Sequence, residues 1–143
     1  MQDANNPTLE DLVAEAFRRT REFVAAIRAV APACTARDSA FIMRCVARLE
    51  DGRLFDDDAD GALAGIRDII CRATEAETIA QHRVFDGYHD PEIGDVGRII
   101  EIPVRTDRGE ELAGVLARLD ALAEARAAAM DRLRAENEVR RQF

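Results

Sequence analysis

The segment from Asp107 to Arg141 constrains the fold most, because its apolar side chains recur at alternating steps of three and four residues. This spacing is typical of a long helix that packs through one seam, as in a coiled coil. At 1.5 Å per residue the helix would be about 50 Å long, so we expect its end, residues 134–143, to project or to meet a partner. Arg126 interrupts the seam. The seam comprises Leu112, Leu116, Leu119, Ala123, Met130 and Leu133.

A shorter helix is predicted between Thr8 and Pro32. Thr8 and Asp11 have the spacing of a capping box, in which each side chain bonds the other residue's backbone N–H at the helix start. Pro32 ends the helix because a proline disfavours the helical conformation of the residue before it. The apolar stripe of this helix consists of Leu9, Leu12, Val13, Ala16, Phe17, Thr20, Val24 and Ile27.

Two further helices are predicted in the middle of the chain. The second helix begins at Thr35 or Asp38 and stops at Gly52, since glycine is favoured just after a helix end. The third runs from about Asp60 to about Val84 and has a wide stripe, which indicates contact with more than one neighbour. Their apolar faces are Phe41, Ile42, Cys45, Val46 and Leu49 in the second helix, and Leu63, Ile66, Ile70, Ala73 and Ala80 in the third.

Residues 85–106 are predicted to form an irregular crossover that contains one short strand. Ile100, Ile102 and Val104 share a face by the two-residue period of a strand. Pro103 cannot donate a hydrogen bond to a neighbouring strand, which places this strand at an edge or at a terminus. No second strand is evident, so we expect the segment to pair with another chain or to lie as a strap across the helices.

Together these patterns predict an all-α fold. It would be a bundle of about four helices with the crossover at 85–106, forming a single helical domain over residues 1–143. The chain is long enough to bury a core. Its 48% of hydrophobic and 34% of charged residues suit a folded protein rather than a disordered one.

The charge distribution bears on the kind of partner. The formal net charge is −8, and residues 56–106 hold 12 acidic and 5 basic residues. Nucleic acid is not expected as the main partner, because phosphate binding needs a positive face. Arginines in the first and last helices alternate with glutamates, which is typical of a solvated face. These arginines are Arg18, Arg19, Arg21, Arg140 and Arg141.

The cysteines and the apolar runs bear on location. Cys34, Cys45 and Cys71 form no C-x-x-C pair, and an odd number at wide spacing argues against a disulfide framework or a zinc site. Cys45 lies on an apolar face and is expected to be a buried free thiol. The sequence starts without a signal region, and no apolar run approaches the ~20 residues of a membrane span. We expect a cytoplasmic protein without membrane contact.

The acidic loop at residues 56–67 carries the most specific chemical pattern. Asp56, Asp58 and Asp60 occupy alternate positions, and Gly61 follows at once. Calcium prefers carboxylate oxygens, and a glycine allows the sharp turn that wraps such a loop around the ion. The three aspartates are therefore candidate calcium ligands.

Residues 54–66 resemble the first two-thirds of an EF-hand calcium loop. The resemblance implies a calcium-responsive module. It departs at the twelfth loop position, where an EF-hand carries a bidentate glutamate and this chain has Arg67. The alternative is an acidic helix start, in which Asp58 or Asp60 caps the third helix and the other carboxylates favour its dipole.

Few catalytic patterns fit the chain. All 20 basic residues are arginine, which excludes a Schiff-base lysine and a complete P-loop. His82 and Asp86 would share a face if the third helix continued, with His89 nearby, so a small helical enzyme subunit using these residues is one hypothesis. The other is that all three are polar loop residues.

The hypothesis that fits these observations best is a non-catalytic protein. We expect a helical interaction or structural subunit that self-associates, or docks as an adaptor into a larger assembly. Its partner would be a protein or a second copy of the chain, contacted by the C-terminal helix and the segment 96–105. The candidate contact residues are Leu112, Leu116, Leu119, Met130, Leu133, Ile100 and Ile102.

Overall fold

The computed structural model describes residues 6–30, 32 and 34–142, with the backbone alone at residues 79–82. This part of the chain forms four α-helices and one two-stranded antiparallel sheet. In chain order the elements are α1 (Leu9–Ala29), α2 (Ala36–Glu50), the 3-10 helix η1 (Arg53–Phe55), α3 (Ala59–Ala76), β1 (Thr78–Asp90), β2 (Gly94–Arg105) and α4 (Asp107–Gln142).

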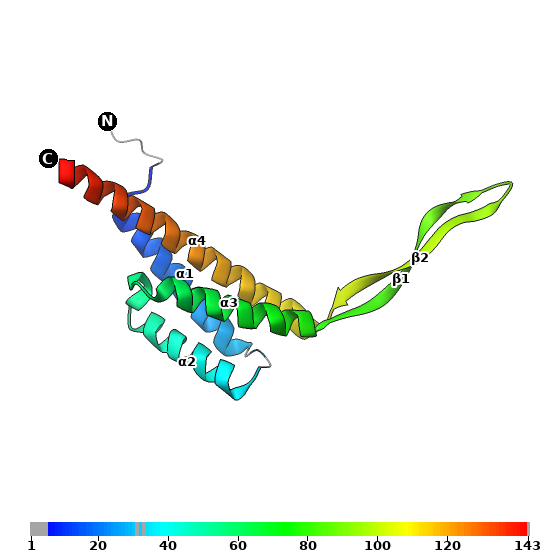
Figure 1. The fold of residues 1–143 in the computed structure, drawn as a ribbon, viewed down its shortest axis with the longest axis horizontal. Helices are drawn as coiled ribbons and strands as arrows, with labels where there is room; N and C mark the ends of the chain where they lie inside the picture. The colour runs from blue at the N-terminus through cyan, green and yellow to red at the C-terminus, as the bar shows by residue number, and fades with distance from the viewer. Residues whose placement is uncertain (1–5, 31, 33, 143) are drawn as a thin grey trace.

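The helices form a bundle organised around α4 (Figure 1). α4 packs along α1 and α3, and α2 lies against α1 and α3. The β1–β2 hairpin leaves the bundle where α3 ends and α4 begins, and it projects away from all four helices. The C-terminal end of α4 lies at the opposite end of the molecule from the hairpin.

The predicted starts of the first two helices are confirmed. The Thr8 hydroxyl accepts a hydrogen bond from the Asp11 N–H, and the Asp11 carboxylate accepts one from the Thr8 N–H, so the capping box is complete. The Thr35 hydroxyl accepts a hydrogen bond from the Asp38 N–H at the start of α2. These caps satisfy backbone N–H groups that have no partner within the helix.

The core lies between the helices and is built from their apolar stripes. Its largest fully buried side chains include Phe23 of α1, Ile66 and Ile70 of α3, and Leu119 and Leu122 of α4. Burial of one such side chain contributes about 1.5–3 kcal/mol. The stability of the fold therefore resides in the bundle.

The predicted all-α class is wrong, because residues 78–105 form a β-hairpin. The segment 85–106 is not an irregular crossover with one strand. Its second strand is β1, which pairs with β2 from Thr78 opposite Arg105 to the turn at the tip. The strand predicted from Ile100, Ile102 and Val104 thus pairs within its own chain.

The predicted third helix is also too long, since α3 ends at Ala76 instead of near residue 84. The apolar residues that follow, including Val84, Phe85 and Tyr88, are of types that favour strands. The error was to extend the helical spacing beyond Ala76 as far as Val84. The side chain of Ala80, predicted on the helix face, lies outside the described part of the structure.

The turn that closes the hairpin follows from three residue types in a row. The Asp90 carboxylate accepts hydrogen bonds from the backbone N–H groups of Glu92 (2.8 Å) and Ile93 (3.1 Å). Pro91 has the fixed φ that a turn needs. Gly94 has a φ of 93°, in the left-handed region that glycine adopts without strain.

Near the tip of the hairpin, Gly87 lies opposite Gly97. A Cβ on Gly87 would lie 2.1 Å from the carbonyl oxygen of Val96, and one on Gly97 would lie 2.3 Å from that of Asp86. Both distances are far below van der Waals contact. The two strands therefore approach so closely at this glycine pair that a side chain would force them apart.

Arg126 is a buried cation in the seam of α4, with 4% of its surface exposed. Its Nε donates to the carbonyl oxygen of Leu54 (2.7 Å), and its Nη2 donates to that of Asp56 (3.3 Å). Its Nη1 binds the carboxylate of Asp60. The guanidinium ties α4 to η1 and to the start of α3, which accounts for a charged residue inside the apolar seam.

Because the core lies in the bundle, the same isoleucine-to-alanine substitution should destabilise the fold more in the bundle than in the hairpin. Ile70 is fully buried, whereas Ile99 of β2 is 67% exposed. We expect Ile70→Ala to lower the free energy of unfolding by about 2–5 kcal/mol, and Ile99→Ala to change it by less than about 0.5 kcal/mol. Chemical denaturation followed by circular dichroism measures both. Equal losses would mean that the hairpin shares the core of the bundle.

A second prediction concerns the buried arginine. Arg126→Met leaves the Leu54 carbonyl oxygen without its donor and removes the partner of the Asp60 carboxylate, whereas the Asp56 carbonyl oxygen keeps the Ala59 N–H. We therefore expect a loss of about 2–3 kcal/mol in the free energy of unfolding. Arg132→Met on the same helix is the matched control, because Arg132 is exposed and its ion pair is with Glu136 of the same helix. The control is expected to unfold like the wild type. Indistinguishable denaturation curves for all three proteins would contradict the role of Arg126.

Candidate interaction surface

The hairpin carries most of the exposed apolar surface. In the described part of the chain nine large apolar residues are exposed, and six of them lie between β1 and β2 or on these strands. Single exposed apolar residues are ordinary, but a group of them marks an interaction site. The six are Val84, Phe85, Tyr88, Ile93, Ile99 and Ile102.

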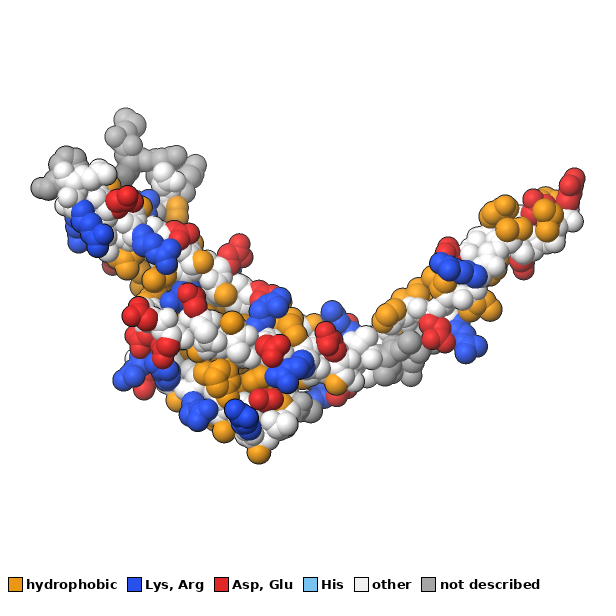
Figure 2. All heavy atoms as spheres, in the orientation of Figure 1, with side chains coloured by type: hydrophobic (Ala, Val, Ile, Leu, Met, Phe, Trp, Pro, Cys, Tyr) orange, Lys and Arg blue, Asp and Glu red, His pale blue; other side chains and the backbone are white. Residues whose placement is uncertain are grey.

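Apolar side chains stand on both faces of the hairpin. Residues directly opposite each other on paired strands share a face. Val84 lies opposite Ile100 on one face, and Phe85 lies opposite Ile99 on the other. Figure 2 shows these apolar side chains distributed along the projecting arm. No helix in the described part of the chain covers either face.

Two polar side-chain pairs link the strands, one near the middle of the hairpin and one near the tip. Arg83 lies 3.6 Å from Glu101, and His89 Nδ1 lies 2.8 Å from the Asp95 carboxylate. Such cross-strand pairs support the register of a hairpin. Residues 86–95, called the tip below, carry four acidic residues and no arginine or lysine. The acidic residues of the tip are Asp86, Asp90, Glu92 and Asp95.

The base of the hairpin is fastened to the bundle by hydrogen bonds between the ends of α3 and α4. The Thr106 N–H donates to the Glu77 carbonyl oxygen (3.0 Å), and the Thr106 hydroxyl donates to the Glu77 carboxylate (3.0 Å). The same hydroxyl accepts from the N–H of Gly109 (3.0 Å). The Thr78 hydroxyl donates to the Thr74 carbonyl oxygen (3.0 Å). The arm therefore leaves the bundle in a set direction.

The predicted contact residues on α4 fall into two groups. Leu112 and Leu119 are buried in the chain's own core, and Leu116 is half-buried against it. These three are used within the chain. Met130 is half-buried and Leu133 is 40% exposed, so only the later part of the seam is accessible.

The accessible contact residues lie at two separate places. Ile100 is half-buried and Ile102 is 40% exposed, both on β2. The other place is the end of α4, defined here as residues 131–142, which is almost entirely exposed. Val139 there is 54% exposed. Sequence reasoning missed the apolar residues of β1 because β1 was assigned partly to a helix. It missed Val139 because the residues around Val139 are nearly all polar.

The aspartates of the acidic loop bind arginines. Asp58 lies 2.5 Å from Arg48 and Asp56 lies 3.8 Å from the same guanidinium, while Asp60 binds Arg126. Asp58 occupies the N-cap position of α3 without a capping hydrogen bond from its side chain. No group of three or more His, Cys, Asp or Glu among the described residues could hold a metal ion. Calcium binding stays a prediction, and it would require the arginines to release these carboxylates.

His82, Asp86 and His89 lie along β1, so the helix that would have grouped His82 with Asp86 is not there. At about 3.3 Å per residue, the backbones of His82 and His89 are roughly 23 Å apart. His89 binds Asp95 across the hairpin. The side chain of His82 lies outside the described part of the structure.

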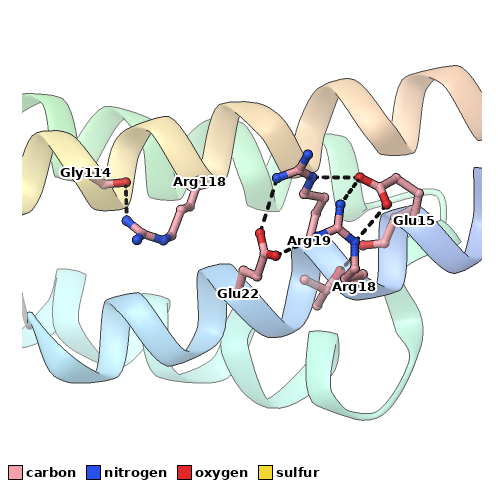
Figure 3. Close-up of polar contacts among 8 residues, drawn as sticks. Glu15, Arg18, Arg19, Glu22, Gly114 and Arg118 are labelled. Carbon is pink, nitrogen blue, oxygen red and sulfur yellow. Dashed lines mark hydrogen bonds and ion pairs between the residues drawn. The ribbon is translucent and has the colours of Figure 1, made fainter.

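Two of the arginines weighed as phosphate contacts are engaged by glutamates on α1 (Figure 3). Arg18 binds Glu15 at 2.6 Å and Glu22 at 2.9 Å. Arg19 binds the same two carboxylates at 2.9 and 3.3 Å. Two guanidinium groups and two carboxylates balance each other, so this face carries no local excess of positive charge.

The predicted buried thiol at Cys45 is confirmed, and all three cysteines are free. Burial raises the pKa of the Cys45 thiol, and the nearby Arg48 and Arg44 oppose that effect. A thiol with a raised pKa remains protonated and is a poor nucleophile. Cys45 is therefore a packing residue of α2.

The network on α1 predicts a pH dependence. The hydrogen bond from Arg18 lowers the pKa of the Glu15 carboxyl, with Arg19 acting in the same direction. A carboxyl whose pKa is lowered by folding stabilises the fold above its unfolded pKa, and this contribution is lost as the pH falls through the folded pKa. We expect Arg18→Ala to raise the titration midpoint of Glu15 in NMR, and Arg21→Ala to leave it in place. The same midpoint in wild type and Arg18→Ala would contradict the prediction.

Two broader findings concern the class of protein. In the part of the chain that the structure describes, none of the helices combines the length and the apolar character needed to cross a bilayer. The chain matches no protein-family model, no curated protein and no solved structure.

Proposed function

We propose that this protein is a non-catalytic interaction subunit that binds another protein chain through its projecting hairpin and through the end of α4. The observation that carries the proposal is a long two-stranded hairpin with exposed apolar side chains on both faces. The hairpin takes part in a larger assembly, where a neighbouring chain covers these faces.

The energetics of an isolated hairpin support this proposal. A two-stranded hairpin alone is marginally stable in water, and it needs a further strand or a packed face for independent stability. At about 3.3 Å per residue, the 12 residues of β2 extend roughly 40 Å. The outer edges of both strands also present backbone groups that can pair with another chain. A partner that packs on the arm would stabilise the hairpin and would also pair or cover its open strand edges.

The shape of the molecule supports a role in docking as well. The hydrogen bonds among Glu77, Thr106 and Gly109 fix the arm to the ends of α3 and α4. Binding to a surface on an arm of fixed direction costs less ordering entropy than binding to a flexible loop. The bundle thus acts as a rigid mount for the arm. With three free thiols, a reducing cytoplasmic location fits the same proposal.

Site-specific photocrosslinking tests the proposal in the cells that make the protein. A photoreactive residue replaces Tyr88 (63% exposed) or Ile99 (67% exposed) on the arm. Met43 on α2 (58% exposed) is the matched control, because it is equally apolar and accessible but lies on the bundle. We expect discrete adducts from the arm positions and none from Met43, read by gel shift and mass spectrometry.

Two results would contradict the proposal. One is the absence of any adduct at both arm positions while the protein is folded and expressed. The other is the same adduct pattern from Met43 as from the arm, which would indicate random collisions.

A further inference from the structure

The tip of the hairpin combines negative charge with exposed apolar side chains. Its four acidic residues have no arginine or lysine among residues 86–95. Tyr88 is 63% exposed and Ile93 is 78% exposed. Asp90 holds the turn and Asp95 binds His89, whereas the carboxylates of Asp86 and Glu92 form no ion pair with any described residue. The tip therefore fits a partner surface that is basic and partly apolar.

At the end of α4, which holds four arginines and three acidic residues in all, two arginines without an ion pair to any described residue stand beside exposed apolar side chains. Leu133 and Val139 are exposed there. A shallow groove of about 420 Å³ runs beside Val139. Within the described residues Arg140 and Arg141 form no ion pair, while Arg132 binds Glu136 (3.3 Å). The residues that line the groove are Arg132, Ala135, Glu136, Val139 and Arg140.

These two surfaces lie at opposite ends of the molecule (Figure 1), so they cannot meet within one chain. Figure 2 shows acidic and apolar side chains at the tip, and arginines together with acidic side chains on the end of α4. Of the exposed large apolar residues in the described part of the chain, only Met43 lies outside the hairpin and the end of α4. One chain thus carries both halves of a complementary contact.

We propose that the tip of one copy docks on the end of α4 of a second copy. This proposal rests on the interaction role proposed above. Ile93 and Tyr88 would contact Val139 and the apolar wall of its groove, and Glu92 would face Arg140. Such a contact joins two different surfaces and is therefore heterologous. Repeated from copy to copy, it produces a chain of molecules or a closed ring.

Sedimentation velocity of the full chain tests this contact. Glu92→Arg reverses one charge at the tip, and Arg140→Glu reverses one at the end of α4. Glu124→Arg and Arg37→Glu are the matched controls, because they make the same charge changes at exposed positions away from both surfaces. Circular dichroism verifies that all four variants keep the helical fold.

We expect the wild type to form species that grow with concentration, and each reversal to weaken their association at least about tenfold. The controls should behave as the wild type. Mixing the two reversal variants should restore assembly, since a reversed tip then meets a reversed α4 end. Assembly should also weaken between about 0.01 M and about 1 M salt, as the screening length falls from about 30 Å to about 3 Å.

Several outcomes would overturn the head-to-tail contact. A wild type with the mass of one chain at every concentration would do so. Loss of assembly in Glu92→Arg but not in Arg140→Glu would instead indicate two hairpins paired about a two-fold axis. Crosslinks from Tyr88 to a different protein, with a monomeric wild type, would reject self-association and leave the interaction role intact. The absence of all crosslinks would reject the interaction role itself.

Discussion

The arrangement of the helices depends on the buried guanidinium of Arg126. Its partners are the carbonyl oxygens of Leu54 and Asp56 and the carboxylate of Asp60, so one side chain of α4 holds η1 and the start of α3. A buried carbonyl group without a donor costs about 1–3 kcal/mol, which makes this contact hard to replace. The contact therefore joins α4 to the segment that leads into α3.

Local signals were sufficient to predict much of the bundle. The capping box of Thr8 and Asp11 and the cap of Thr35 involve residues only three apart in the sequence, and each marks a helix start directly. The apolar seam of α4 likewise lies within one helix, so the sequence of that helix alone predicts it. Its interruption by Arg126 was the one visible trace of a buried polar contact. The partners of that arginine lie 66 to 72 residues away in the sequence, so no local pattern could name them.

Local signals could not predict the hairpin, because its residues taken one at a time fit a loop or a helix as well as a strand. Gly87, Pro91 and three acidic residues give β1 and the turn the composition of a loop, and Ile79 continues the helical spacing of α3. What defines the strands is their pairing with each other, without a core beneath them to impose a clean alternation. The same holds for the acidic loop, where the sequence shows carboxylates but the structure places Arg48 and Arg126 against them.

The facing glycines at 87 and 97 have an evolutionary consequence for the reach of the arm. Since a side chain at either position would collide with the opposite strand, the two glycines must remain in register with each other. An insertion in one strand alone would shift that register and turn alternate side chains to the other face. Equal additions to both strands would lengthen the arm without shifting that register. Each added pair of residues per strand moves the tip about 6.6 Å outward, so related chains should have arms that differ in regular steps.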